Sequence, residues 1–242
     1  MSIVKHIPNT ITSLNLLSGV TGVIVGLSGN PAAGFVCMLA AAVFDFCDGL
    51  AARLLHAYSP IGKELDSLAD VVSFGVLPAT LLWAVMAKGT PLYLHVIPLL
   101  LAAFSALRLA KFNLDERQES DFLGLPTPAS ALIAGSLAHF ISTSPGNAFA
   151  QFAEASYWFI PLLAAVLCAL VVSEIPMFGM KIKKGAKLFD AKRVVFLVFA
   201  AVSIAFTIAF SLKWSLAVLM IFGFYVLENI AIALLCNKRK IN

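Results

Sequence analysis

The chain has 242 residues, of which 60% are hydrophobic and 12% charged, and its mean hydropathy is +0.94. These values exclude an ordinary water-soluble domain and predict an all-α protein embedded in a membrane. The formal net charge of +4 reflects basic residues between apolar segments, which is a signal of membrane topology. We therefore expect no nucleic acid as a partner.

Eight apolar segments are long enough, at about 20 residues each, to cross the bilayer core as helices. They cover residues 10–28, 32–56, 64–87, 91–112, 127–143, 155–174, 193–211 and 214–236. If both termini are cytoplasmic, all of the 17 Lys and Arg residues except Lys88 and Lys213 fall on inner loops or helix ends. The positive-inside rule thus predicts a polytopic bundle of about eight helices with cytoplasmic termini.

The sequence shows no repeat and no separate soluble domain, so we expect one integral membrane domain over residues 1–242. Residues 8–176 carry all the motifs described below and form the expected catalytic core. Residues 190–242 add a helix pair without an assignable motif. The basic stretch 180–192 is either a segment that rests on anionic headgroups or a plain topogenic loop.

Four aspartates stand out in this apolar chain: Asp45 and Asp48, then Asp66 and Asp70. Spacings of three and four place each pair on one face of its own helix. A single carboxylate at the bilayer centre costs about 2.5–3.5 kcal/mol, so four together indicate that they face one another around a cation. In an antiparallel hairpin Asp48 lies level with Asp66, and Asp45 with Asp70. With no His or Cys ligand nearby, oxygen donors favour Mg²⁺ or Mn²⁺.

Small and basic residues lie beside these acids. Gly49 and Ala52 leave room for a ligand, although small residues in membrane helices also serve packing. Arg53 can offer a forked donor to phosphate or extend to the membrane interface. Acids for a metal, space for a ligand and a guanidinium for phosphate together indicate phosphoryl transfer from a diphosphate donor.

The motif Asp45-x2-Asp48-Gly49-x2-Ala52-Arg53-x8-Gly62-x3-Asp66-x3-Asp70 resembles the signature of the CDP-alcohol phosphatidyltransferase family at every fixed position. The resemblance implies a helical membrane enzyme that transfers a phosphatidyl or phosphoalcohol group from a CDP-linked donor to an alcohol and releases CMP. It implies two divalent ions, held by Asp45, Asp48, Asp66 and Asp70, with Asp70 also acting as general base. It further implies a CDP site formed by Asn9, Thr12, Gly49, Ala52, Arg53, Ser59 and Gly62.

Four further stretches, 65–75, 108–113, 124–129 and 172–176, resemble the branch of the family that uses L-serine. This resemblance implies CDP-diacylglycerol as donor, and metal-assisted attack of the serine hydroxyl on the β-phosphorus to give phosphatidylserine and CMP. Arg108, Lys111 and Asn113 are candidate ligands for the serine carboxylate or the lipid phosphate. Arg108 and Lys111 are also interpretable as anchors at the inner leaflet.

Two alternatives stay open at this point. A phosphatidylglycerophosphate or phosphatidylinositol phosphate synthase would share the motif and differ in the acceptor alcohol. A cation-coupled transporter would also carry acids inside the membrane, but it would not need Arg53 beside them, and it would favour discontinuous central helices.

We further expect a homodimer among the lipids of a bacterial or archaeal-type cell membrane, with the active site facing the cytoplasm.

Overall fold

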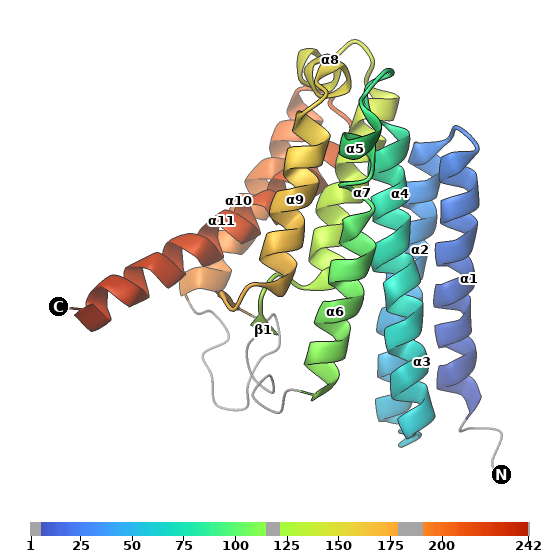
Figure 1. Cartoon of the computed structure of the whole chain (residues 1–242). Helices are drawn as coiled ribbons and strands as arrows, with labels where there is room; N and C mark the ends of the chain where they lie inside the picture. Colours follow the sequence, from blue (N-terminus) through green and yellow to red (C-terminus); the bar gives the residue numbers. More distant parts are fainter. Residues whose placement is uncertain (1–5, 115–121, 179–190, 242) are drawn as a thin grey trace.

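The computed structural model describes residues 6–114, 122–178 and 191–241, which form a bundle of helices (Figure 1). The predicted all-α fold is confirmed, apart from one pair of two-residue strands. Most of the basic stretch 180–192 lies outside the described residues. In chain order the elements are α1 (Ile7–Leu27), α2 (Pro31–Leu54), α3 (Pro60–Asp70), the π-helical segment η2 (Val71–Val76), α4 (Leu77–Ala84), α5 (Leu92–His95), α6 (Leu100–Leu114), β1 (Phe122–Leu123), α7 (Thr127–Thr143), α8 (Ala148–Ala155), α9 (Phe159–Val172), β2 (Pro176–Met177), α10 (Ala191–Ala209) and α11 (Trp214–Ile241).

Within the described residues, six helical segments are long and apolar enough to cross a membrane. They are α1, α2, the continuous run Pro60–Ala84, the run Leu92–Leu114, α10 and α11. The pair α8 and α9, bent by 86°, would make a seventh span if it crosses as one unit. α7 has 17 residues, slightly fewer than the ~20 that a full crossing needs. All eight predicted segments contain helix, while eight crossings and cytoplasmic termini stay predictions.

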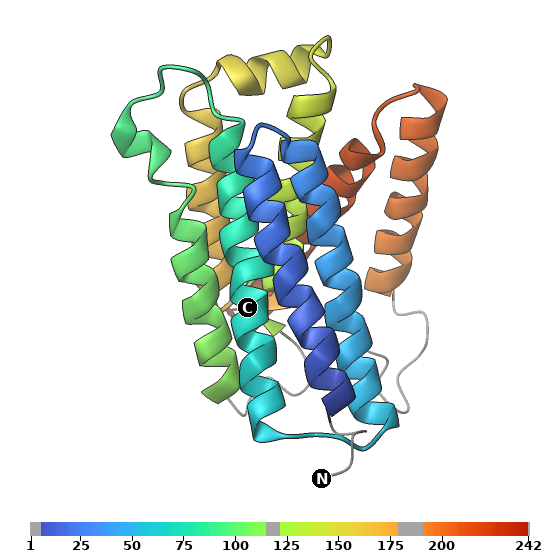
Figure 2. The ribbon, with the colours of Figure 1, turned by 90° about the vertical axis from the view of Figure 1, so that its right-hand side faces the viewer.

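The first two helices form a tightly packed antiparallel hairpin, seen side by side in Figure 2. Asn30 caps α2 by accepting a hydrogen bond of 3.0 Å from the Ala33 amide, and Pro31 occupies the first turn, where no amide donor is required. A Cβ on Gly34 would lie 2.9 Å from the Gly22 carbonyl oxygen, so glycine allows this close approach of the helices. The hairpin places the first turns of α1 beside the last turns of α2.

The third span begins at Pro60, four residues before the predicted apolar run. Ser59 caps α3 by accepting a hydrogen bond of 3.0 Å from the Gly62 amide. Directly after Asp70 the helix widens into η2, where Ser73 Oγ donates to the Asn15 carbonyl oxygen at 3.1 Å. π-helical segments often occur at functional sites, and this one ties α3 to α1 next to an acid of the motif.

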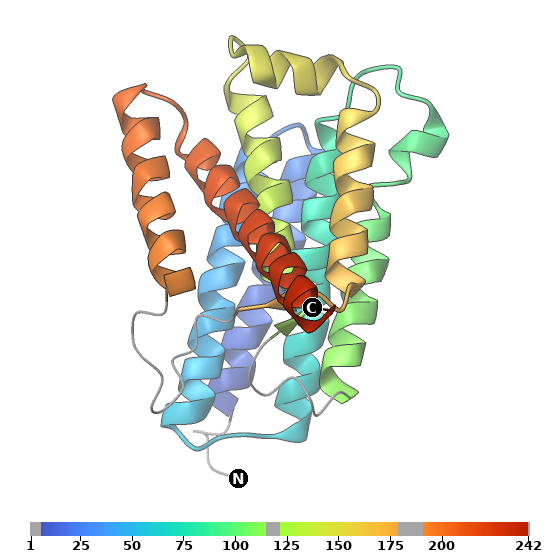
Figure 3. The same ribbon diagram turned by 90° about the vertical axis from the view of Figure 1, so that its left-hand side faces the viewer.

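α7 runs through the middle of the bundle and contacts α2, α4, α9 and α11. Most of its side chains are buried, and its own Leu137 belongs to the same hydrophobic core as Phe35 of α2 and Leu81 of α4. α7 therefore packs mainly against protein rather than lipid. α10 packs against α11, which crosses the bundle obliquely against α7 (Figure 3).

Candidate active site

Three of the four motif aspartates meet between α2 and α3. Asp45, Asp48 and Asp66 each offer one carboxylate oxygen, and the three oxygens lie within 4.8 Å of one another. Asp48 is buried, while Asp45 and Asp66 are half-buried. Asp70 lies outside this group, buried at the end of α3, but close enough to Asp45 and Asp66 to interact with them electrostatically. We call Asp45, Asp48 and Asp66 the aspartate cluster.

The donor set of the aspartate cluster fits a divalent cation. Three carboxylates this close repel one another unless a positive charge lies between them. Asp66 Oδ1 is buried and has no hydrogen-bond partner among the described residues, so this oxygen is available as a ligand for a cation. Hard oxygen donors suit Mg²⁺ or Mn²⁺. The cluster could therefore hold such an ion.

Two polar side chains of α1 orient the acids. Thr12 Oγ1 donates a hydrogen bond to Asp48 Oδ2 at 2.6 Å, and Asn15 Nδ2 donates to Asp70 Oδ1 at 3.2 Å. Thr12 and Asn15 are three residues apart, so they lie on one face of α1, and both are buried. The sequence predicted a site role for Thr12 and missed that of Asn15. The available signal was a polar residue one turn after Thr12, among several other polar residues of this helix.

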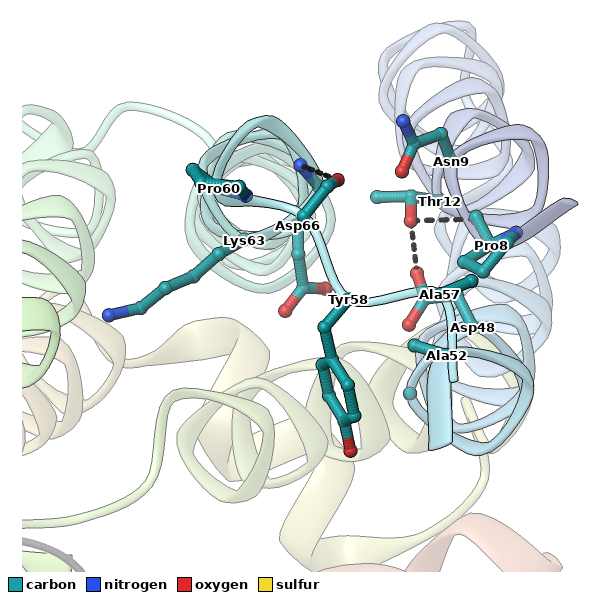
Figure 4. A pocket seen from close by; sticks show the side chains of 13 residues that line it. Pro8, Asn9, Thr12, Asp48, Ala52, Ala57, Tyr58, Pro60, Lys63 and Asp66 are labelled. Atoms are coloured by element: carbon teal, nitrogen blue, oxygen red, sulfur yellow. Dashed lines mark hydrogen bonds between the residues drawn. The ribbon is translucent and has the colours of Figure 1, made fainter. Parts of the chain in front are cut away.

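A pocket of about 470 Å³ opens beside the aspartate cluster. Figure 4 shows Asp48 of α2 and Asp66 of α3 pointing toward each other, with Thr12 bonded to Asp48. Six of the seven predicted CDP-binding residues are in its lining, and Arg53 is not. The lining consists of Pro8, Asn9, Thr12, Asp48, Gly49, Ala52, Ala57, Tyr58, Ser59, Pro60, Gly62, Lys63 and Asp66.

The two motif glycines of this pocket have different surroundings. A Cβ on Gly49 would meet no atom within 4 Å, so Gly49 leaves open space beside the acids. A Cβ on Gly62 would lie 2.9 Å from both Asn9 Oδ1 and Ser59 Oγ, so Gly62 allows two polar side chains to approach the backbone. Arg53 is exposed, and its Nε donates to the Gly49 carbonyl oxygen at 2.9 Å.

Several pocket residues were not singled out from the sequence. Tyr58 and Lys63 bring an aromatic ring and an ammonium group to the lining, and Pro8, Ala57 and Pro60 complete it. All of them lie within two residues of Asn9, Ser59 or Gly62 along the chain, which was the available signal. Lys63 Nζ donates to the Asn113 carbonyl oxygen of α6 at 3.3 Å.

The three candidate ligands on α6 lie in different environments. Arg108 is 7% exposed, and its Nη1 donates to Thr127 Oγ1 of α7 at 3.2 Å. Its Nε and Nη2 are buried with no partner among the described residues, unlike an arginine that anchors at the membrane interface. Lys111 is exposed, and Asn113 is half-buried, with its Nδ2 donating to Ser67 Oγ at 2.9 Å. These residues therefore do not form one compact site.

Two of the sequence stretches that resemble the serine-using branch of the family, 124–129 and 172–176, contact each other directly. The Gly124 amide donates to the Ile175 carbonyl oxygen and the Leu125 amide to the Leu170 carbonyl oxygen, both at 2.9 Å. Beside them β1 and β2 pair in antiparallel fashion. We call residues 122–127 and 170–178 the junction. It leads into α7 at Thr127, the partner of Arg108.

The sequence model of the CDP-alcohol phosphatidyltransferase family matches residues 5–235. The chain therefore belongs to this divalent-metal-dependent family, as its motif predicted. Family membership and the apolar helices together identify an integral membrane protein.

Curated relatives carry names that specify a serine acceptor. The CDP-diacylglycerol–serine O-phosphatidyltransferase of Mycobacterium leprae (strain TN) is 37% identical over 179 residues, which cover 71% of this chain and 57% of that protein. The protein of the same name from Bacillus subtilis (strain 168) is 34% identical over 128 residues, which cover 53% of this chain and 72% of that protein. The archaetidylserine synthase of Methanothermobacter thermautotrophicus (strain Delta H) is 34% identical over 135 residues, which cover 54% of this chain and 56% of that protein. The chain thus spans 57% to 60% of the length of the mycobacterial relatives it matches.

Proposed function

We propose that this protein transfers the phosphatidyl group of CDP-diacylglycerol to L-serine, giving phosphatidylserine and CMP. The observation that carries the proposal is that the pocket and the aspartate cluster share Asp48 and Asp66. A nucleotide in the pocket would thus have its phosphates beside the cation-binding acids. The names of the relatives support serine as the acceptor.

In this proposal the CDP moiety occupies the pocket. Gly49 provides the space beside the acids, while Asn9 and Ser59 offer polar atoms near Gly62. Ala52 lines the same wall one turn later without a bulky side chain. Arg53 lies exposed beyond Gly49 and is the guanidinium assigned to the diphosphate.

Asp45, Asp48, Asp66 and Asp70 would together hold two Mg²⁺ or Mn²⁺ ions. Bound divalent ions supply charge neutralisation of the diphosphate and of the departing CMP. The protein contributes the orientation of the ligands, because Thr12 fixes one oxygen of Asp48 and Asn15 fixes one oxygen of Asp70.

Asp70 would act as general base on the acceptor. An alcohol is a poor nucleophile at neutral pH, so a base must take its proton as the new bond forms. Asn15 occupies Asp70 Oδ1, and the proposal assigns the proton to Oδ2. The serine oxygen then bonds to the β-phosphorus, the bond from that phosphorus to the bridging oxygen breaks, and CMP leaves with the electron pair. A single displacement of this kind inverts the configuration at phosphorus.

Arg108 is the residue assigned to the serine carboxylate. It is buried, it is an electrostatic neighbour of Asp70, and its unpartnered Nε and Nη2 form a forked donor suited to a carboxylate. Lys111 and Asn113 lie further along the same helix toward the Lys63 edge of the pocket, and we assign them to the lipid phosphate. We further propose that the site faces the cytoplasm and that the enzyme is a homodimer.

The transporter alternative is not supported. It favours discontinuous central helices, whereas the spans that carry the acids, α2 and Pro60–Ala84, each run without interruption. Another acceptor alcohol within the family is the alternative that an experiment must separate from serine.

CMP release from CDP-diacylglycerol by the purified protein in detergent tests the proposal. L-serine, glycerol 3-phosphate and inositol phosphate are compared as acceptors, each with Mn²⁺, Mg²⁺ or EDTA. We expect release that depends on serine, stops with EDTA and is lost in Asp70→Asn. Release with another alcohol alone would retain the family and refute serine as the acceptor.

A further inference from the structure

Two buried side chains of α11, in the helix pair without a motif, form hydrogen bonds with the end of the junction. Asn229 Oδ1 accepts a hydrogen bond from the Phe178 amide at 2.9 Å, and the Tyr225 hydroxyl donates to the Phe178 carbonyl oxygen at 3.0 Å. Asn229 and Tyr225 are 2% and 7% exposed, and Asn229 Nδ2 also donates to the Tyr225 carbonyl oxygen at 2.7 Å. Two α11 side chains thus satisfy both backbone groups of Phe178, as a neighbouring strand would.

Phe178 is the last described residue of the junction, so α11 holds one end of it. From there the junction continues through the pairing of β2 with β1 and the bond from the Gly124 amide to the Ile175 carbonyl oxygen. Its other end is Thr127, which accepts the hydrogen bond from Arg108. Hydrogen bonds and short backbone segments of the junction therefore connect α11 to Arg108.

Tyr225 also lies near Arg108 in space. Within the described part of the chain, Tyr225 and Asp70 are titratable neighbours of Arg108, so α11 contributes to the surroundings of this guanidinium. The Tyr225 ring packs edge-on against Phe178 and Phe196, with ring centroids 5.2 and 5.9 Å apart. The ring is therefore held in place by packing even without its hydroxyl hydrogen bond.

We propose that Tyr225 and Asn229 are positioning residues for the acceptor alcohol, because they hold the junction and thereby the guanidinium of Arg108. This inference rests on the proposed function, in which Arg108 binds the acceptor carboxylate. It assigns α11 to the acceptor side of the site. The pocket for the donor nucleotide is lined only by residues between Pro8 and Asp66 and includes none from α11. Loss of the α11 contacts should therefore weaken acceptor binding selectively.

The test compares KM values of Tyr225→Phe and Asn229→Leu for serine and for CDP-diacylglycerol. Tyr225→Phe removes the hydroxyl and retains the packed ring, so it is the milder change. Ser215→Ala is the matched control, because fully buried Ser215 of α11 also makes one hydrogen bond, of 2.9 Å to His139, away from the junction. Thermal unfolding of each purified variant verifies that it is folded.

Each junction variant loses one hydrogen bond to Phe178, and we expect it to raise the KM for serine about three- to tenfold, with the KM for CDP-diacylglycerol unchanged. Ser215→Ala should change neither KM, even if it lowers the melting temperature. The inference would be overturned if the KM for serine is unchanged in both junction variants, or if the KM for serine and the KM for CDP-diacylglycerol rise equally. Activity of the wild type with serine would still uphold the proposed function in that case. If the wild type uses another alcohol, the proposed function fails. The inference is then tested by comparing the KM for that alcohol between the wild type and the junction variants. No CMP release with any acceptor would overturn both.

Discussion

Thr12 of α1 donates a hydrogen bond of 2.6 Å from Oγ1 to Asp48 Oδ2 of α2. The same hydroxyl lies 3.1 Å from the Pro8 carbonyl oxygen. A hydroxyl has one proton, and the shorter bond to an ionised acceptor is the stronger of the two. α1 therefore fixes the orientation of one member of the aspartate cluster.

Replacing Thr12 should weaken metal binding. Thr12→Val keeps the side-chain shape and removes the donor, so Asp48 loses the bond that orients it. We expect the Mn²⁺ concentration for half-maximal CMP release to rise about tenfold or more, the usual cost of losing a group that orients a metal ligand. Thr10→Val is the control, since the one hydrogen bond of the exposed Thr10 hydroxyl to the described residues goes to the His6 carbonyl oxygen at the start of the same helix. Equal metal titrations for Thr12→Val and the wild type would contradict this role.

Replacing Asn15 should slow catalysis with little effect on donor binding. Asn15→Leu removes the donor to Asp70 Oδ1, which leaves the proposed base without its orienting bond. We expect kcat to fall about 10- to 100-fold. The KM for CDP-diacylglycerol should change little, because Asn15 is not among the residues that line the pocket. Steady-state kinetics check this, with Ser13→Ala of the same helix as control; a rise in donor KM at constant kcat would refute it.

The aspartate cluster should destabilise the metal-free protein. In Asp66→Asn one of three mutually repelling carboxylates becomes neutral. We therefore expect the melting temperature in EDTA to rise by a few degrees, which corresponds to a gain in the free energy of unfolding on the order of 1 kcal/mol. Added Mn²⁺ should raise the melting temperature of the wild type and have little effect on the variant. Glu64→Gln removes an exposed charge from the same helix and serves as control. A variant that is stabilised by Mn²⁺ as strongly as the wild type would show that Asp66 is not a ligand.

The stability of the junction should depend on the absence of a side chain at Gly124. Its φ is +75°, and a Cβ there would lie 2.6 Å from the Ser173 carbonyl oxygen and 2.7 Å from that of Val171. Gly29 has a similar φ of +97° but open surroundings. Gly29→Ala should therefore cost about 1 kcal/mol, the backbone strain alone, and Gly124→Ala clearly more. Thermal unfolding measures both, and equal losses of stability would show that the junction can relax around a methyl group.

Much of the site followed from local spacing. Helical periodicity places Asp45 and Asp48 on one face of α2, and a tight turn brings Asp66 of α3 opposite them, so the aspartate cluster was predictable. The role of Asn15 was not, because it depends on how far α1 is rotated and shifted against α3. That placement is set by close contacts such as the one between Gly19 and Ser73.

The sequence alone determined that this protein is a helical membrane protein and that it carries four convergent aspartates typical of divalent-metal phosphotransfer. These properties follow from hydropathy and from spacings of a few residues, which any helix reproduces, while the family was predicted from the resemblance of the motif to a known signature. The tertiary structure decided which remote polar groups meet: Asn15 with Asp70, Arg108 with Thr127, and Asn229 with Phe178. Each of these contacts depends on the rotation and depth of whole helices, which result from the packing of the entire bundle around α7.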